Sequence, residues 1–198
     1  MKGDFFIMIE HSAHPSTKFR FSAKHLAFCA MCMALSFVLN NYCKLWEMPF
    51  GGSITLFSML VACLPGFWYG PVAGIVTGVA LGLLNFVIKP YFLSVPQVFV
   101  DYVLAFGALG FSGFFHKAKF GLVKGYTVGI IGRFVFAVIS GCIFWGSYAA
   151  DYDMSPLPYS LLYNALYIFT EGFITVAILF LPPVHKTMIQ LRNMATEN

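Results

Sequence analysis

The chain has 198 residues, of which 59% are hydrophobic and only 10% are charged, and its formal net charge is +4 at pH 7. Soluble domains carry roughly a quarter charged residues, and a globule of this size could not hide so much apolar surface from water. The composition therefore excludes an ordinary soluble protein and predicts a membrane protein that is embedded in the lipid bilayer.

The first 22 residues are predicted to form a cytoplasmic tail. Their one apolar stretch, 5–9, is too short for the core of a signal peptide and has acidic neighbours. His11 and His14 lie in this tail, and two histidines alone do not indicate a metal site.

Six apolar segments then follow, each long enough to be a transmembrane helix. In chain order they are 24–42, 53–69, 71–88, 96–115, 122–145 and 159–181. The predicted fold class is an all-α membrane protein with six transmembrane helices. We expect one substrate-binding domain, 23–185, and a cytoplasmic C-terminal tail, 186–198.

The basic residues predict the orientation. If both termini are cytoplasmic, most lysines and arginines lie inside, and only Lys44 and Lys89 lie outside. This is the positive-inside pattern. We expect a multi-pass protein of the plasma membrane. The positive charge is explained by topology, so no nucleic-acid partner is predicted.

Two helices carry stripes of small residues. Gly74, Gly78 and Gly82 follow one another at four-residue spacing, which lets a neighbouring helix approach closely. We expect this stripe to pack inside the protein. The first helix has a second small stripe, formed by Ala27, Ala30 and Ala34.

Three ionisable residues, Asp101, Arg133 and Glu171, fall within predicted spans, where each costs roughly 2.5–3.5 kcal/mol at the helix centre. Arg133 and Glu171 have similar depth and opposite charge, so we predict a structural ion pair. A role for Glu171 in proton coupling is the alternative.

Asp101 and Asn164 both lie about 7–8 Å below the outer membrane surface, at a rise of about 1.5 Å per residue. Aromatic residues gather at the same layer, namely Tyr91, Tyr102, Trp145, Tyr148 and Tyr159. An interfacial belt explains such aromatics equally well, but it does not explain the deeper carboxylate and amide. Together they predict a pocket for a flat, nitrogen-rich cation, because aromatic faces and carboxylates attract cations.

Three stretches carry a family resemblance: SVPQVFVDYVLAFGALG (94–110), RFVFAVISGCIFWGSYA (133–149) and YSLLYNALY (159–167). The chain resembles the thiamine-specific substrate-binding (S) components of energy-coupling factor (ECF) vitamin transporters. This resemblance implies a six-helix protein that captures thiamine outside the cell. It also implies three partners, a membrane coupling protein and two cytoplasmic ATPases.

The resemblance assigns residue roles as well. The positions that match those contacting thiamine are Tyr91, Asp101, Tyr102, Gly141, Trp145, Tyr159, Ser160 and Asn164. The stripe of Ala27, Ala30 and Ala34 resembles the family's face for the coupling protein. There are two departures. Ala137 stands where the family has a histidine, and the tryptophan expected in the first outer loop aligns with Gly51-Gly52, where Trp46 or Phe50 could substitute.

Three functions are therefore compared. The leading hypothesis is an S component for thiamine or a close analogue. An S component for another vitamin or for a thiamine precursor is an alternative. A solitary secondary transporter for a cationic aromatic amine is the second. An enzyme is not expected, because no nucleophile–base or metal set lies within the spans. No cofactor is predicted, and no Gly-rich stretch ends in the G-K-[ST] of a nucleotide-binding loop.

Overall fold

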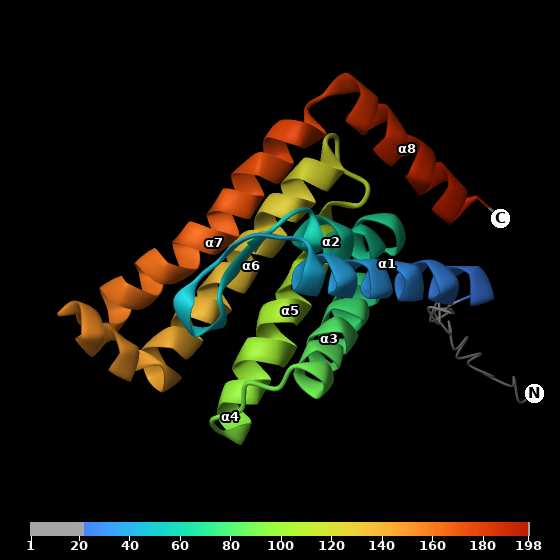
Figure 1. The fold of residues 1–198 in the computed structure, drawn as a ribbon. Coiled ribbons are helices and arrows are strands. Elements are labelled where there is room, and N and C mark those ends of the chain that lie inside the picture. Colours follow the sequence, from blue (N-terminus) through green and yellow to red (C-terminus); the bar gives the residue numbers. More distant parts are fainter. Residues whose placement is uncertain (1–21, 198) are drawn as a thin grey trace, which may run out of the picture.

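The computed structural model describes residues 22–197, so the predicted N-terminal tail, with His11 and His14, lies outside the described residues except for Ser22. The long helices form one bundle (Figure 1). They are α1 (Ala23–Tyr42), α2 (Ser58–Tyr69), α3 (Pro71–Ile88), α6 (Gly121–Phe144), α7 (Pro156–Leu179) and α8 (Pro182–Thr196). Between α3 and α6, a further helical stretch covers residues 95–115.

Within the described part of the chain, five helical segments are long and apolar enough to cross a membrane: α1, α3, 95–115, α6 and α7. The bounds of α3 are those predicted from the sequence. The sixth segment, α2, is apolar but has only 12 residues. It is almost completely buried, with only Tyr69 partly exposed, and it packs against α1, α3 and α6.

The predicted helix 53–69 is wrong in its first residues, and the fold is not purely α-helical. Ser53–Thr55 forms strand β2, which pairs antiparallel with β1 (Lys44–Glu47). A short 3₁₀ turn, Pro49–Gly51, joins the two strands. Gly51 has a φ of 95°, which favours glycine, and β-branched Ile54 and Thr55 suit a strand. Hydrophobicity alone could not separate this hairpin from the helix that follows it.

Residues 95–115 form a continuous helical stretch whose winding changes along its length. A short α-helix, α4 (Val95–Val98), leads into a π-helical segment, η2 (Phe99–Leu104). After one α-helical turn, α5 (Ala105–Gly107), the stretch ends as a 3₁₀ helix, η3 (Ala108–Phe115). Asp101 lies in the π-helical segment, and such segments are frequent at functional sites because they change the direction of side chains.

The glycine stripe of α3 packs inside the protein, as predicted. A Cβ atom added to Gly82 would lie 1.8 Å from the carbonyl oxygen of Tyr102, and one added to Gly78 would lie 2.5 Å from that of Phe106. At Gly74 the nearest backbone oxygen, that of Gly110, would be at 2.7 Å. The backbones of α3 and of residues 95–115 therefore touch without intervening side chains.

Most of the predicted C-terminal tail forms a helix. In Figure 1, α8 folds back from the end of α7 and runs toward the beginning of α1. The hydroxyl of Tyr69 donates a hydrogen bond to the carbonyl of Ala195 at 3.1 Å, and Arg192 donates one to the carbonyl of His116 at 2.8 Å. Because α8 is amphipathic and only moderately hydrophobic, a search for apolar segments does not find it.

We expect Gly82→Ala to destabilise the purified protein, because its methyl group would push α3 away from the backbone of Tyr102. Overpacking of this kind costs about 1–3 kcal/mol, measurable as a lower Tm in detergent. Val87→Ala is the control, since Val87 is 74% exposed on the same helix, and should change stability by less than about 0.5 kcal/mol. Equal stability of Gly82→Ala and wild type would contradict the close backbone contact.

Candidate functional site

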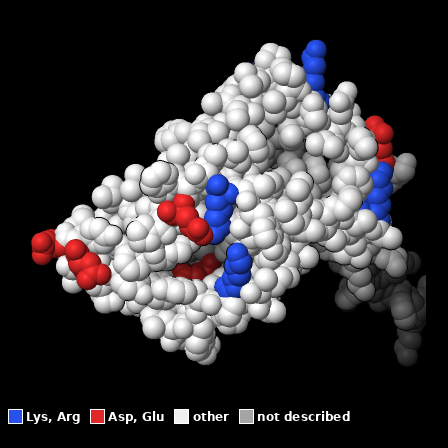
Figure 2. Space-filling view, in the orientation of Figure 1, with Lys and Arg blue, Asp and Glu red and all other residues white. Residues whose placement is uncertain are grey.

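One cavity of about 460 Å³ lies among the hairpin, α3, residues 95–107, α6 and α7. Figure 2 shows the hollow on this face, with charged side chains around it on an otherwise mostly uncharged surface. All nine residues predicted to bind the substrate line this cavity: Tyr91, Asp101, Tyr102, Gly141, Trp145, Tyr148, Tyr159, Ser160 and Asn164. The structure thus brings together side chains from four separate parts of the sequence.

Asp101 is held by hydrogen bonds to one of its two carboxylate oxygens. Oδ2 accepts from Nε2 of Gln97 at 2.6 Å and from the indole Nε1 of Trp145 at 3.4 Å. Gln97 is buried one helical turn before Asp101, so it fixes the carboxylate from its own helix. Within residues 22–197, Oδ1 accepts no hydrogen bond and is available to a ligand.

Aromatic rings stack at one side of the cavity. Tyr91 and Trp145 stack with centroids 4.9 Å apart, and Trp145 and Tyr148 at 5.9 Å with planes within 5°. Phe50, from the hairpin, adds a ring 4.1 Å from that of Tyr148. We call these four rings the aromatic stack. Their faces carry negative electrostatic potential, which suits a planar cation.

The hydroxyl groups of Tyr91 and Tyr148 lie 3.0 Å apart and share a hydrogen bond. This bond, together with partial burial, raises the pKa of the Tyr91 hydroxyl. The backbone N–H of Tyr91 donates to the hydroxyl of Tyr102 at 3.1 Å, which ties the loop to the helix that carries Asp101.

Asn164 uses its donors within the protein. Its Nδ2 donates to the carbonyl of Ser160 at 2.9 Å and to that of Ala137 at 3.4 Å, while Oδ1 accepts from the hydroxyl of Tyr167 at 2.9 Å. The amide nitrogen of Asn164 is therefore already used inside the protein. One lone pair of Oδ1 remains, which suits an amino group on the ligand.

Glycine is required at position 141, because a Cβ there would lie 2.0 Å from Oγ of Ser160. Ser160 in turn donates to the carbonyl of Val138 at 3.1 Å, which joins α6 and α7 beside the cavity. Ala137, the departure from the family pattern, also lines the cavity. Because its side chain is small, Asn164 and Tyr167 provide the polar groups of this part of the cavity wall.

The sequence analysis missed part of the cavity wall. Tyr163 and Tyr167 continue the row begun by Tyr159, with Tyr159 and Tyr163 stacked at 5.8 Å. Their four-residue spacing on one helix could have revealed them. Missed polar residues come from α1, the hairpin, α3 and α4: Asn40, Asn41, Lys44, Glu47, Asn85 and Gln97.

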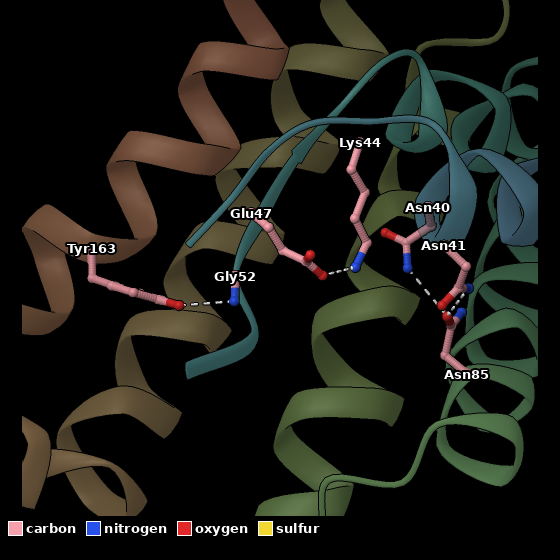
Figure 3. Close-up of polar contacts among 7 residues, drawn as sticks. All are labelled: Asn40, Asn41, Lys44, Glu47, Gly52, Asn85 and Tyr163. Carbon is pink, nitrogen blue, oxygen red and sulfur yellow. Dashed lines mark hydrogen bonds and ion pairs between the residues drawn. The ribbon is translucent and has the colours of Figure 1, made fainter. Parts of the chain in front are cut away.

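The polar residues at the α1 and α3 side of the cavity bind one another (Figure 3). Nδ2 of Asn40 and of Asn41 each donate to Oδ1 of Asn85 at 3.2 Å. Lys44 and Glu47 form an ion pair, and the hydrogen bond from Lys44 lowers the pKa of the Glu47 carboxyl. Asparagines inside apolar spans are a signal that sequence analysis could have used.

The predicted ion pair between Arg133 and Glu171 is not formed in the structure. The guanidinium of Arg133 lies 4.5 Å from the ring centroid of Phe106 and lines the cavity. Glu171 instead faces the N-terminus of α2, where its carboxylate accepts from the backbone N–H of Met59 at 3.0 Å. The two residues were paired because of their similar depth, but their side chains point toward different neighbours.

Ala27, Ala30 and Ala34 all lie on the exposed face of α1. The buried residues of this helix, Cys29, Cys32 and Ser36, lie on its opposite side. The three alanines thus form a smooth outer surface, and the partner that covers it stays a prediction.

Comparisons with known proteins agree on one family. The family model described as thiamine transporter protein (Thia_YuaJ) matches residues 26–191. The thiamine transporter ThiT of Bacillus subtilis is 36% identical to this chain over an alignment of 146 residues, which covers 67% of this chain and 74% of that protein.

Solved structures are similar as well. One of ThiT from Listeria monocytogenes has a TM-score of 0.64 and 25% identity, over 80% of this chain and 94% of the other. A structure of the S component of a bacterial ECF transporter has a TM-score of 0.51 and 22% identity, over 79% and 93%, and shows a shared fold. The family match and the Bacillus relative together show that this chain is a multi-pass membrane protein of the thiamine transporter (Thia_YuaJ) family, a family of transporters and not of enzymes.

Proposed function

We propose that the chain is the thiamine-binding S component of an ATP-driven vitamin importer in the plasma membrane. The observation that carries the proposal is the gathering of all nine predicted binding residues around one cavity. Family membership supports thiamine as the ligand, and the fold supports an S component.

The chemistry of the cavity suits thiamine, which has a positively charged thiazolium ring and an aminopyrimidine ring. In the proposed complex the aromatic stack holds the cationic ring by cation–π attraction, with Oδ1 of Asp101 as the negative charge nearby. Oδ1 of Asn164 accepts a hydrogen bond from the pyrimidine amino group. A cavity of about 460 Å³ lies within the usual range of ligand pockets, about 300–1,000 Å³.

We further propose the orientation in the membrane. The cavity mouth, with Lys44, Glu47 and Lys89, faces outside, and both termini are cytoplasmic. Lys117, Lys119 and Lys186 then lie inside, in agreement with the positive-inside rule. The short α2, together with its hairpin, counts as the sixth membrane segment of the domain 23–185, and the end of α8 belongs to the proposed cytoplasmic segment 186–198.

Energy for uptake is proposed to come from partners, since the sequence carries no recognisable nucleotide-binding loop. A membrane coupling protein would pack on the exposed face formed by Ala27, Ala30 and Ala34. Two cytoplasmic ATPases would supply the energy through this coupling protein. Small side chains suit such a contact because they let helices approach closely within the bilayer.

Asp101→Asn is expected to weaken thiamine binding at least tenfold, or about 1.4 kcal/mol, because it removes the negative charge that faces the cation. Equilibrium dialysis of the purified protein with labelled thiamine measures this directly. Asp151→Asn is the matched control, since Asp151 is exposed and lies outside the cavity. Equal affinity of Asp101→Asn and wild type would refute the site.

Purified chain reconstituted alone in lipid vesicles should bind thiamine without accumulating it, even under an imposed proton or sodium gradient. An S component lacks its own energy source, whereas a solitary secondary transporter would concentrate the solute. Uptake of labelled thiamine into the vesicles distinguishes the two. Accumulation that depends on the gradient would favour the solitary transporter and contradict the proposal.

Ala30→Trp is expected to abolish thiamine uptake by whole cells while leaving thiamine affinity of the purified protein within about twofold of wild type. The bulky ring would keep the coupling protein away from α1 without reaching the cavity. Leu35→Trp is the control, because Leu35 is exposed on the same helix outside the alanine face. Normal uptake by the Ala30→Trp variant would place the partner elsewhere.

A further inference from the structure

We propose that Glu171 is a positioning residue for ligand binding, which holds the root of the β1–β2 hairpin by capping the N-terminus of α2. This inference rests on the proposed function, because it concerns the hairpin that covers the proposed thiamine site. Glu171 does not itself line the cavity. It acts through the segment 53–59, which connects the hairpin to α2.

The N-terminus of α2 lacks a cap from its own sequence. Phe57, at the N-cap position, has a left-handed backbone with φ of 61° and makes no side-chain hydrogen bond to the helix. The first N–H groups of a helix need acceptors, and α2 begins inside the protein, away from water. Oε1 of Glu171 accepts from the N–H of Met59 at 3.0 Å, from a position 112 residues further along the chain. The cap of α2 is thus supplied by α7.

A carboxylate suits this position because donors surround it. Besides Met59, the hydroxyl of Thr55 donates to Oε2. The hydroxyl of Ser58 lies 3.2 Å from Oε1 and 2.7 Å from the Thr55 hydroxyl, so its single proton serves one of these two contacts. The positive end of the helix dipole adds a favourable interaction with the negative charge. Glu171 is only 2% exposed, and a buried carboxylate is retained only where such donors compensate its loss of water.

The cap connects directly to the cavity. Thr55, which donates to Glu171, is the last residue of β2. At the other end of β2, Gly52 donates its N–H to the hydroxyl of Tyr163 at 2.8 Å (Figure 3), and that hydroxyl donates to the carbonyl of Pro49. α7 therefore holds the hairpin at both its root and its tip.

The spacing of the two attachment points is similar on α7 and on the hairpin. Tyr163 and Glu171 are eight positions apart on α7, or about 12 Å along its axis, on neighbouring faces of the helix. Gly52 and Thr55 are three positions apart in an extended strand, or about 10 Å. Strand β2 therefore runs alongside α7. Phe50, at the tip, is thereby kept on Tyr148 in the aromatic stack.

The test uses Glu171→Ala and Glu171→Gln, with Thr175→Val as the matched control. Thr175 lies one turn further along α7, is equally buried, and its hydroxyl has no hydrogen-bond partner among the described residues. Hydrogen exchange of the backbone amides of 48–59, followed by mass spectrometry, reports on the hairpin in the protein without ligand. Equilibrium dialysis gives thiamine affinity of the same preparations.

Glu171→Ala should speed amide exchange in 48–59 and weaken thiamine binding, each by about tenfold or more, because the N–H of Met59 and the hydroxyl of Thr55 lose their acceptor. Glu171→Gln should have a smaller effect of the same kind, since its one amide oxygen can still accept from Met59. If Glu171→Ala does not fold, Glu171→Gln alone tests whether Glu171 holds the hairpin. Thr175→Val should leave both quantities within about twofold of wild type.

Unchanged exchange of 48–59 in the folded Glu171 variants would overturn the inference, as would weakened binding without faster exchange. Equal effects of Thr175→Val would also overturn it, since they would show a general response to changes in α7. Failure of the wild-type chain to bind thiamine would instead overturn the proposed function. The exchange measurement needs no ligand, so it still decides whether Glu171 holds the hairpin.

Discussion

The position of Asp101 depends on how closely α3 approaches the helix that carries it. Gly82 of α3 lies directly against the carbonyl of Tyr102, the residue after Asp101, and no larger side chain fits between them. Without water or a hydrophobic drive, helices in a bilayer associate through such close backbone contacts. The glycines of α3 thereby fix the depth and direction of a carboxylate that lies on the neighbouring helix.

Two oxygen atoms in the cavity wall can still accept hydrogen bonds. Most buried polar groups around it are satisfied internally, such as Asn85, which accepts from two asparagines of α1, and the amide nitrogen of Asn164. Oδ1 of Asp101 and one lone pair of Asn164 Oδ1 remain. Both residues line the cavity, so in the proposed complex these two oxygens are where a ligand would supply a donor or a positive charge.

Hydropathy and depth predicted where helices begin and end and which residues share a layer. They did not predict how each side chain points around its helix. The bounds of α3 and the layer that contains Asp101, Trp145 and Asn164 followed from the sequence. Depth does not determine which way a side chain points around its helix, so equal depth wrongly suggested a pair between Arg133 and Glu171. Depth did select seven of the nine cavity residues, and the family resemblance added Gly141 and Ser160, which neither charge nor an aromatic ring makes conspicuous.

The hairpin and α8 were missed for different reasons. Residues 53–57 run into α2 without an intervening glycine or proline, and the change from strand to helix depends on Phe57 adopting a left-handed backbone, which its side chain does not predict. α8 mixes polar and apolar residues, so a criterion built for spans rejects it. The hairpin precedes the first residue of α2, and α8 contacts Tyr69, its last residue.

The length of α2 links these features. Twelve residues of helix are about 18 Å long, whereas the hydrocarbon core of a bilayer is about 30 Å thick. The chain at the end of such a helix needs internal partners for its backbone groups, because lipid offers none. Glu171 is such a partner for the N–H of Met59 at the N-terminal end. At the other end of α2, the hydroxyl of Tyr69 donates to the carbonyl of Ala195 and so attaches α8. A non-helical segment at this depth is tolerated where it lines a cavity, which is where the β1–β2 hairpin lies. The short helix therefore accounts for both the buried carboxylate and the hairpin beside the binding cavity.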